Sequence, residues 1–247
     1  MTLYSDLHAK PVINAAATLT RLGGSLMPPE VLAAMDEASR AFVDLEDLQR
    51  RVGERLAALT HNEAAYVATG AAAGIALAVI ACMVGNDKEA RQRLPDTSDL
   101  RNEVVVFKSH RNGYDHAIRM TGARLIEIGD GTSTDPAELV AALSERTAAF
   151  VWFQGAMTGR ADFALETVIA ICSERGVPVI VDGAAQLPPV ENLWRFTQMG
   201  ATCAIFSGGK DLSGPQSSGL VVGKRDLIEA MRPLGSPNQG FMRPMKV

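Results

Sequence analysis

Two short stretches decide the fold: Val177-Pro178-Val179-Ile180-Val181-Asp182 and, one short helix later, Ala204-Ile205-Phe206-Ser207-Gly208-Gly209-Lys210. Both begin as apolar runs, which are typical of buried strands. The first run ends in the carboxylate of Asp182, and the second leads into a glycine-rich turn that holds Lys210. Strands that end in such side chains commonly place them in a ligand cleft. The pattern therefore marks Asp182 and Lys210 as candidate site residues.

The turn around Lys210 differs from an ordinary surface loop, although an isolated lysine is usually solvated. Gly208, Gly209 and Gly214 allow the backbone to approach a ligand closely. A phosphate-binding P-loop is the first alternative, but its pattern fails at Ala204, where a glycine is required, and at Asp211, where a serine or threonine is required.

A partly desolvated lysine can instead act as a nucleophile that forms Schiff bases. Pyridoxal phosphate needs such a lysine for its aldehyde, an aspartate for its pyridine nitrogen and a helix N-terminus for its phosphate. Lys210 and Asp182 supply the first two. Gly70, Ala71 and Ala72, in a small-residue bend before a helix expected over 75–84, are candidates for the third, and Ser207 can donate to the same phosphate. The alternative is that this glycine- and alanine-rich helix start only packs tightly.

Two longer motifs, 181–186 (VDGAAQ) and 206–216 (FSGGKDLSGPQ), resemble those of the SelA-like group of fold-type I pyridoxal phosphate enzymes. The group includes bacterial selenocysteine synthase and D-glucosaminate-6-phosphate ammonia-lyase, and the motifs here are closer to the latter. The similarity runs from about Val12 to the last residue.

This resemblance implies an α/β fold, the large domain of the fold-type I enzymes, with a mainly parallel seven-stranded sheet flanked by helices. It implies an N-terminal segment (1–60) at a homodimer interface and a large domain (61–247) that binds pyridoxal 5′-phosphate. The C-terminal small domain of relatives is expected to be absent.

The resemblance also implies further site residues. His110, at the end of an apolar strand, is expected to stack on the cofactor ring, with a purely structural histidine as the alternative. Gln186 is expected to reach the cofactor's O3′. Relatives place an asparagine in the loop 154–159, where this chain offers only Gln154 as a substitute. Arg21 is a candidate contact for an anionic substrate group, although a lone arginine is more often a surface residue.

Strand and helix patterns alternate along the chain, which indicates βαβ units and a parallel sheet. We expect strands over 63–68, 104–107, 125–129, 148–154, 177–182, 204–206 and 219–223, the last of them antiparallel. We expect an exposed linker over 86–102.

The composition excludes several classes of protein. The 247 residues are 47% hydrophobic with a net charge of −4 and a pI near 5.6, so the chain has no basic field for nucleic acid. Cys82, Cys172 and Cys203 lie in apolar runs without metal-ligand spacing and are interpreted as buried hydrophobes. The apolar run 71–84 falls short of the roughly twenty residues that a membrane span needs. The N-terminus does not resemble a signal peptide, so a cytoplasmic location is expected.

The resemblance implies a lyase that removes water and ammonia from a hydroxylated amino acid or amino sugar acid by α,β-elimination, leaving a 2-keto acid. Lys210 would be the general base and acid at Cα. Racemisation, β-replacement of the selenocysteine-synthase type and a truncated, noncatalytic cofactor-binding subunit remain as alternatives. A small-molecule amino acid is the expected partner.

Overall fold

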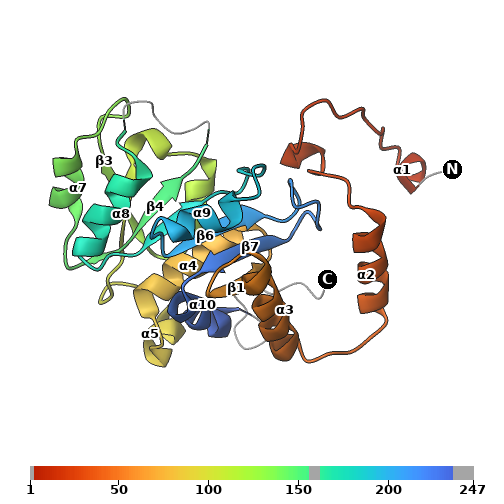
Figure 1. Ribbon diagram of the computed structural model, residues 1–247, viewed down its shortest axis with the longest axis horizontal. Coiled ribbons are helices and arrows are strands. Elements are labelled where there is room, and N and C mark those ends of the chain that lie inside the picture. The colour runs from red at the N-terminus through yellow and green to blue at the C-terminus, as the bar shows by residue number, and fades with distance from the viewer. Residues whose placement is uncertain (1–2, 156–161, 236–247) are drawn as a thin grey trace.

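The computed structural model describes residues 3–155 and 162–235. Within them a seven-stranded sheet runs in the order β1-β7-β6-β5-β4-β2-β3 (Figure 1). The strands are β1 (Ala64–Ala68), β2 (Glu103–Phe107), β3 (Arg124–Ile128), β4 (Thr147–Phe153), β5 (Val179–Asp182), β6 (Cys203–Ser207) and β7 (Gly219–Gly223). β7 is antiparallel to β1 and β6, and all other pairs are parallel. The predicted fold and the antiparallel last strand are confirmed.

Helices cover both faces of this sheet (Figure 1). The described helices, of which α1 and α2 lie apart from the sheet, are α1 (Leu3–Asp6), α2 (Pro29–Ser39), α3 (Leu45–Leu59), α4 (Ala71–Val84), α5 (Lys88–Arg93), α6 (His116–Arg119), α7 (Pro136–Ala142), α8 (Leu165–Glu174), α9 (Asn192–Gln198) and α10 (Arg225–Met231), with 3-10 turns η1 (Thr20–Leu22), η2 (Lys108–His110), η3 (Gly113–Asp115) and η4 (Arg232–Leu234). The described helices include none with the length and apolar character needed to cross a membrane.

The core is divided into two apolar layers by the alternation of side chains along each strand. Val104 and Val106 of β2 belong to the layer formed with α4, α6 and α10. Val105 and Phe107 belong to the opposite layer, formed with α3, α7, α8 and α9. A parallel sheet needs apolar cover on both faces, and this is why its strands read as continuous apolar runs in the sequence.

Local sequence signals explain where several helices begin. Asp44 caps α3 by accepting hydrogen bonds from the backbone N–H groups of Glu46 and Asp47. Asp135 and Glu138 form a capping box at the start of α7. On α3, the amide of Gln49 donates to Val67 O at 2.7 Å and accepts from Val67 N at 3.1 Å, so it satisfies part of the open edge of β1.

Two expectations need correction. The region 86–102 is not an exposed linker throughout, because α5 forms there and Ala90 and Thr97 are buried. Asp87 caps α5 through the N–H groups of Glu89 and Ala90, a local signal that the polar composition conceals. The helix expected over 75–84 begins earlier, at Ala71, so the small residues lie inside its first turn.

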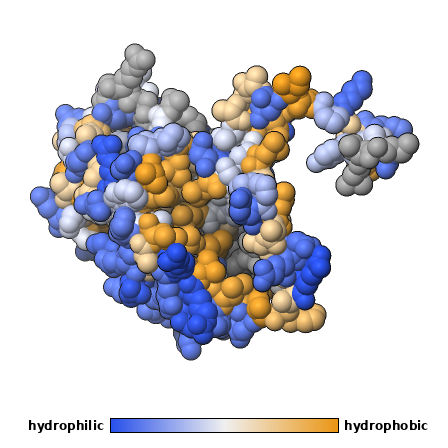
Figure 2. All heavy atoms as spheres, turned by 45° about the vertical axis from the view of Figure 1, so that its right-hand side comes forward, coloured by the Kyte–Doolittle hydropathy of each residue, from blue (hydrophilic) through white to orange (hydrophobic). Residues whose placement is uncertain are grey.

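Residues 3–44 form an N-terminal arm that extends from the body of the molecule (Figure 1). Its helix α2 buries none of its residues. Figure 2 shows apolar side chains along the arm and on the hollowed face between the arm and the body. Ile13 and Leu26 are almost completely exposed, at 100% and 95%.

Candidate active site

A cavity of about 200 Å³ opens at the carboxyl ends of β4, β5 and β6. This is the edge at which open parallel sheets bind their ligands. The residues that line it are Thr20, Gly70, Ala71, Ala72, Ile75, Tyr114, Phe153, Gln154, Asp182, Ala184, Ala185, Ser207, Lys210 and Gln216. Six of the predicted site residues therefore meet in one cavity, although they come from distant parts of the chain.

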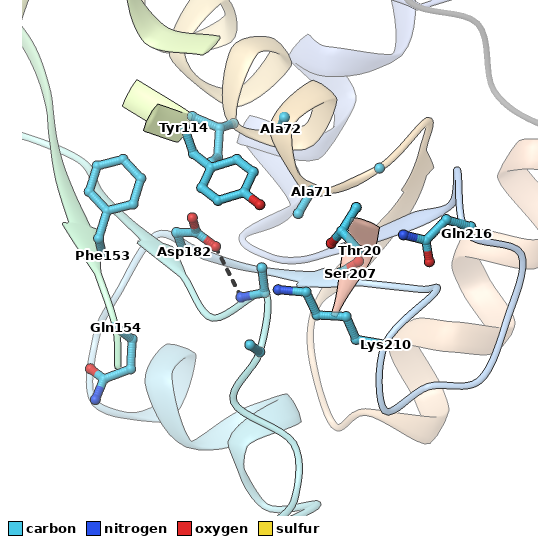
Figure 3. A pocket seen from close by; sticks show the side chains of 14 residues that line it. Thr20, Ala71, Ala72, Tyr114, Phe153, Gln154, Asp182, Ser207, Lys210 and Gln216 are labelled. Carbon is cyan, nitrogen blue, oxygen red and sulfur yellow. Dashed lines mark hydrogen bonds between the residues drawn. The ribbon is translucent and has the colours of Figure 1, made fainter. Parts of the chain in front are cut away.

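Lys210 enters the cavity from the turn that follows β6. Gly208 N donates to Ser218 O at 2.8 Å and Gly214 N donates to Gly208 O at 2.7 Å, which folds the loop back on itself. Gly208 allows this closure because a Cβ atom there would overlap the side chain of Ser218. The amine of Lys210 points toward the segment that contains Asp182 and Ala184 (Figure 3).

Asp182 ends β5, and only 9% of its surface is exposed. Its Oδ1 accepts a hydrogen bond of 2.9 Å from Ala184 N (Figure 3). Burial raises the pKa of this carboxyl group to about 6, while the Ala184 N–H and the charge of Lys210 oppose the rise. A buried carboxylate of this kind favours a cationic partner such as a protonated ring nitrogen.

The first turn of α4 faces the same cavity. Gly70 is its N-cap, with a φ of 99° and no side-chain capping bond. The first backbone N–H groups of a helix have no intrahelical acceptor, and the helix dipole adds positive potential there. Ala71 and Ala72 have side chains too small to screen these groups, and Ser207 lines the same cavity (Figure 3). The arrangement suits a phosphate.

His110 lies outside the lining of the cavity. Its side chain is fully buried and makes edge-to-face contacts with Phe107 and Trp152, at centroid distances of 4.9 and 4.8 Å. Nε2 lies 3.7 Å from Asp162 Oδ2, and neither ring nitrogen has a hydrogen-bond partner within the described residues. Burial lowers the pKa of His110 to about 4, against the opposing charge of Asp162.

Two other predicted residues are placed beside the cavity rather than in it. Gln186 Nε2 donates to Gln154 O at 3.3 Å, which ties the segment after β5 to the end of β4. Arg21 is exposed next to Thr20, which does line the cavity. Gln154 lines the cavity as expected, with its Oε1 accepting from Trp152 Nε1 at 2.6 Å. The rest of the loop predicted to face the site, 156–159, falls outside the described residues.

The sequence analysis missed several lining residues, of which Tyr114 is the most informative. Its ring lies near Asp182 and the start of α4 (Figure 3). Asn112 caps the turn η3 by accepting from Tyr114 N, and this sequence signal, Asn-Gly-Tyr-Asp, marks a turn before α6. Thr20 reaches the cavity from the N-terminal arm, so no local pattern predicts it, whereas Gln216 ends the 206–216 motif and lies in the same loop as Lys210.

Residues that could hold a metal do not cluster within the described part of the chain. Cys82, Cys172 and Cys203 are free, and burial raises the pKa of Cys82 and Cys172 to about 12. Cys172 and Cys203 are buried as the sequence analysis predicted, whereas Cys82 is only partly buried and packs against the apolar core.

Comparisons with known proteins extend these observations. The chain is 40% identical over 251 residues to 5′-C-glycyluridine monooxygenase-decarboxylase of Streptomyces sp, covering 99% of this chain and 61% of that protein. It is 32% identical over 250 residues to D-glucosaminate-6-phosphate ammonia lyase of Salmonella typhimurium, covering 99% of this chain and 66% of that protein. It is 30% identical over 247 residues to L-seryl-tRNA(Sec) selenium transferase of Solidesulfovibrio magneticus, covering 91% of this chain and 51% of that protein.

The fold is also that of a solved relative. A structure of D-glucosaminate-6-phosphate ammonia-lyase matches with a TM-score of 0.88 and 31% identity, covering 94% of this chain and 63% of that chain. This confirms the resemblance to the SelA-like group and the fold-type I architecture. The chain spans about two thirds or less of the length of these relatives, each of which is named as an enzyme.

The family model "Aminotransferase class-V" matches residues 104–241, more than half of the chain. The matched region includes Asp182, Ser207 and Lys210, and the structure joins to them the first turn of α4. An amine, a buried carboxylate and a helix N-terminus in one cavity fit pyridoxal 5′-phosphate, the cofactor predicted from the sequence. The chain thus belongs to the aminotransferase class-V family, with pyridoxal 5′-phosphate as its cofactor.

Proposed function

We propose that this chain forms the cofactor-binding part of a pyridoxal phosphate-dependent lyase that acts on a hydroxylated α-amino acid. The reaction is an α,β-elimination that releases water and ammonia and leaves a 2-keto acid. The observation that carries the proposal is the meeting of Lys210, Asp182 and the N-terminus of α4 around one cavity.

Each residue of the site has a separate role in the proposed reaction. Bound pyridoxal phosphate supplies the electron sink for negative charge at the substrate's Cα. Lys210 holds the cofactor covalently in the resting enzyme and afterwards moves the proton at Cα. Asp182, ionised, keeps the ring nitrogen protonated. The N–H groups at the start of α4 and the hydroxyl of Ser207 hold the phosphate.

In this proposal Tyr114, and not His110, makes the aromatic contact to the cofactor ring. It lines the cavity, whereas His110 packs beneath it against Phe107 and Trp152. His110 then supports the wall of the site from behind. Gln186 also acts indirectly, by donating a hydrogen bond to the carbonyl of Gln154. Arg21 stays the candidate contact for an anionic group of the substrate, at the opening of the cavity.

The substrate class is an amino acid joined to a sugar-derived chain. Two relatives support this, because the name of one refers to an amino sugar acid phosphate and that of the other to a glycyl group on uridine. The cavity lining also carries hydroxyl and amide groups from Thr20, Tyr114 and Gln154 that suit a hydroxylated ligand.

Oxidative decarboxylation of such an amino acid is the second candidate. The observation in its favour is the 40% identity to a monooxygenase-decarboxylase. The two candidates differ in their products, since elimination releases ammonia while the alternative consumes oxygen and releases carbon dioxide.

Cofactor binding is tested first, by spectroscopy and chemical trapping. Added pyridoxal 5′-phosphate should give an absorbance band at about 420 nm, as expected for its protonated lysine conjugate. Reduction with borohydride should then leave a pyridoxyl group on Lys210, detected by peptide mass spectrometry. Lys210→Ala should lose both signals, whereas Lys224→Ala, which removes an exposed lysine beyond β7, should keep them. Labelling at another lysine would refute the role of Lys210.

The reaction is tested with a panel of D- and L-hydroxy amino acids, amino sugar acids and a glycyl nucleoside. Ammonia and keto acid should appear together in equal amounts. Oxygen uptake with release of carbon dioxide would favour the second candidate, and inversion at Cα without ammonia would favour a racemase.

Assembly and location complete the proposal. We propose a homodimer, supported by the exposed apolar residues of the arm. We propose a cytoplasmic location, supported by three free cysteines in the described chain.

A further inference from the structure

The arm returns to the body of the chain at the peptide that precedes Lys210. Ser25 N donates to Gly209 O at 2.9 Å, and Ser25 Oγ donates to the same oxygen at 3.1 Å. With its amide nitrogen turned toward them, Gln216 donates to Gly209 O at 3.0 Å and to Gly23 O at 3.1 Å. The carbonyl oxygen of Gly209 therefore accepts three hydrogen bonds, two from Ser25 and one from Gln216. Gln216 also binds the arm directly, through Gly23 O.

The arm packs so closely on Gly209 and on the side chain of Gln216 that neither Gly24 nor Gly209 has room for a side chain of its own. A Cβ atom on Gly24 would overlap Gly209 O and the end of the Gln216 side chain. A Cβ atom on Gly209 would overlap the side chain and the backbone of Gln216. Gly24 is buried although its neighbours Gly23 and Ser25 are not. Gly24, Gly209 and Gln216 are thus closely packed against one another, and we call this contact the joint.

This joint acts on the backbone of Lys210. The carbonyl of Gly209 and the N–H of Lys210 belong to one planar peptide group, so bonds to the oxygen fix the orientation of the whole plane. Lys210 N itself donates only a long bond of 3.4 Å to Ser207 O. The shorter bonds on this peptide come from Ser25 on the arm and from Gln216, farther along the loop between β6 and β7.

We propose that Ser25 and Gln216 are positioning residues, which clamp the Gly209–Lys210 peptide and so aim the amine of Lys210 at the cofactor. The inference rests on the proposed role of Lys210. Through this clamp the N-terminal arm takes part in the site of its own chain. Holding the lysine in one direction lowers the entropy lost when it bonds to the cofactor.

The first test measures the clamp in the cofactor-free protein by amide hydrogen exchange. Gln216→Glu keeps the shape of the side chain but replaces the donor with an acceptor that faces two carbonyls. Exchange should rise in peptides covering 20–26 and 207–214. Gln198→Glu, which adds the same charge at the end of α9, should leave both peptides unchanged. Unchanged exchange in Gln216→Glu would overturn the clamp, whether or not the chain binds pyridoxal phosphate.

The second test asks whether the clamp acts through the lysine. Gln216→Glu and Ser25→Ala should weaken pyridoxal 5′-phosphate binding, by about tenfold for Gln216→Glu, since a hydrogen bond is lost and carbonyls face a carboxylate. Ser25→Thr should restore binding, because it keeps the hydroxyl. Ser39→Ala, whose hydroxyl bonds to Asp36 O within α2, should have no effect.

A double-variant cycle with Lys210→Ala separates positioning from direct contact, since Gln216 also lines the cavity. Lys210→Ala binds the cofactor without a covalent bond, so adding Gln216→Glu should then change the affinity by less than about twofold. An undiminished tenfold effect in that background would overturn the positioning role. If the wild type neither binds pyridoxal 5′-phosphate nor is labelled at Lys210, the proposed function is refuted instead. Hydrogen exchange would still show whether the clamp exists.

Discussion

Asp182 is a residue whose proposed role in cofactor binding lowers the stability of the cofactor-free protein. Its carboxylate is buried at the end of β5, and the Ala184 N–H satisfies one of its oxygens. The fold thus maintains a buried charge, for which the proposed partner is the ring nitrogen of the cofactor. Removing that charge should help the cofactor-free fold and harm the function.

Asp182→Asn should therefore stabilise the cofactor-free protein, in a pH-dependent way. The folded pKa of about 6 lies above the ordinary 3.8, so the wild type is penalised when the group ionises as the pH rises through this range. The gain in unfolding free energy should be near zero at pH 4 and on the order of 3 kcal/mol above pH 7. Urea denaturation at several pH values measures it. A gain that is equal at all pH values would contradict the assigned cause.

The same variant should bind pyridoxal 5′-phosphate poorly, because the ring nitrogen loses its anionic partner. Asp211→Asn serves as the control, since it removes an exposed carboxylate next to Lys210. Retention of full affinity in Asp182→Asn would contradict the role given to Asp182.

His110 should affect stability in the opposite direction over nearly the same pH range. Its folded pKa of about 4 lies below the ordinary 6.5, so the unfolded chain takes up the proton first and stability is lost as the pH falls from about 6.5 to about 4. His110→Phe should remove this loss, which is on the order of 3 kcal/mol. His110 and His110→Phe should be compared in proteins that both carry Asp182→Asn. In the wild type the opposite pH dependence caused by Asp182 masks the effect of His110. A slope that persists in the double variant would point to another group.

At the level of elements, the proposed phosphate site depends on a close approach between β7 and α4. A Cβ atom on Gly219, the first residue of β7, would overlap Gly70 and Ala71 N. The position of the first turn of α4 is thus set by a glycine on a strand far along the chain. This contact places open N–H groups at the cavity next to Ser207.

Gly219→Ala should push this helix start away and weaken phosphate binding selectively. The affinity for pyridoxal 5′-phosphate should fall by about tenfold or more, while that for pyridoxal, which lacks the phosphate, should change little. Gly113→Ala is the control, because a Cβ atom there meets open space at an ordinary φ. Equal losses for both ligands would indicate general distortion and contradict the selective effect.

For the whole molecule, the arm presents apolar surface that the body of the chain leaves uncovered (Figure 2). The side chains of Ile13 and Leu26 are exposed on either side of the clamp at Ser25. Exposed apolar patches of this kind commonly mark a protein interface. A second copy that packs on the arm would therefore also reinforce the joint at Gly209.

The proposed dimer predicts a sensitivity to charge on the arm. Ile13→Asp combined with Leu26→Asp should shift the protein from dimer to monomer in sedimentation velocity, since each would bury an unpaired carboxylate at the interface. Glu174→Lys, which changes an exposed charge on α8 outside the arm, is the control. A wild-type protein that sediments as a monomer at all concentrations would rule out the dimer.

The sequence by itself determined what depends on short-range pattern. The apolar runs predicted the strands because both faces of a parallel sheet are covered, and the residues at the strand ends, Asp182, Ser207 and Lys210, followed directly. The small residues of 70–72 predicted an open helix start, which is a local property, and the phosphate assigned to it stays a prediction. The N-cap Asp87 is also a local signal for α5, but its polar surroundings led to the wrong expectation of a linker.

Only the tertiary structure decided which side chain of a given segment reaches the cavity. His110 and Tyr114 are four residues apart after β2, and the turns between them direct the histidine into the apolar layer and the tyrosine over the site. Thr20 and Ser25 come to the site from the N-terminal arm, and Ser25 Oγ donates to Gly209 O although the two residues are 184 positions apart in the sequence. Such contacts arise from packing between distant elements, and neither periodicity nor spacing in the sequence encodes them locally.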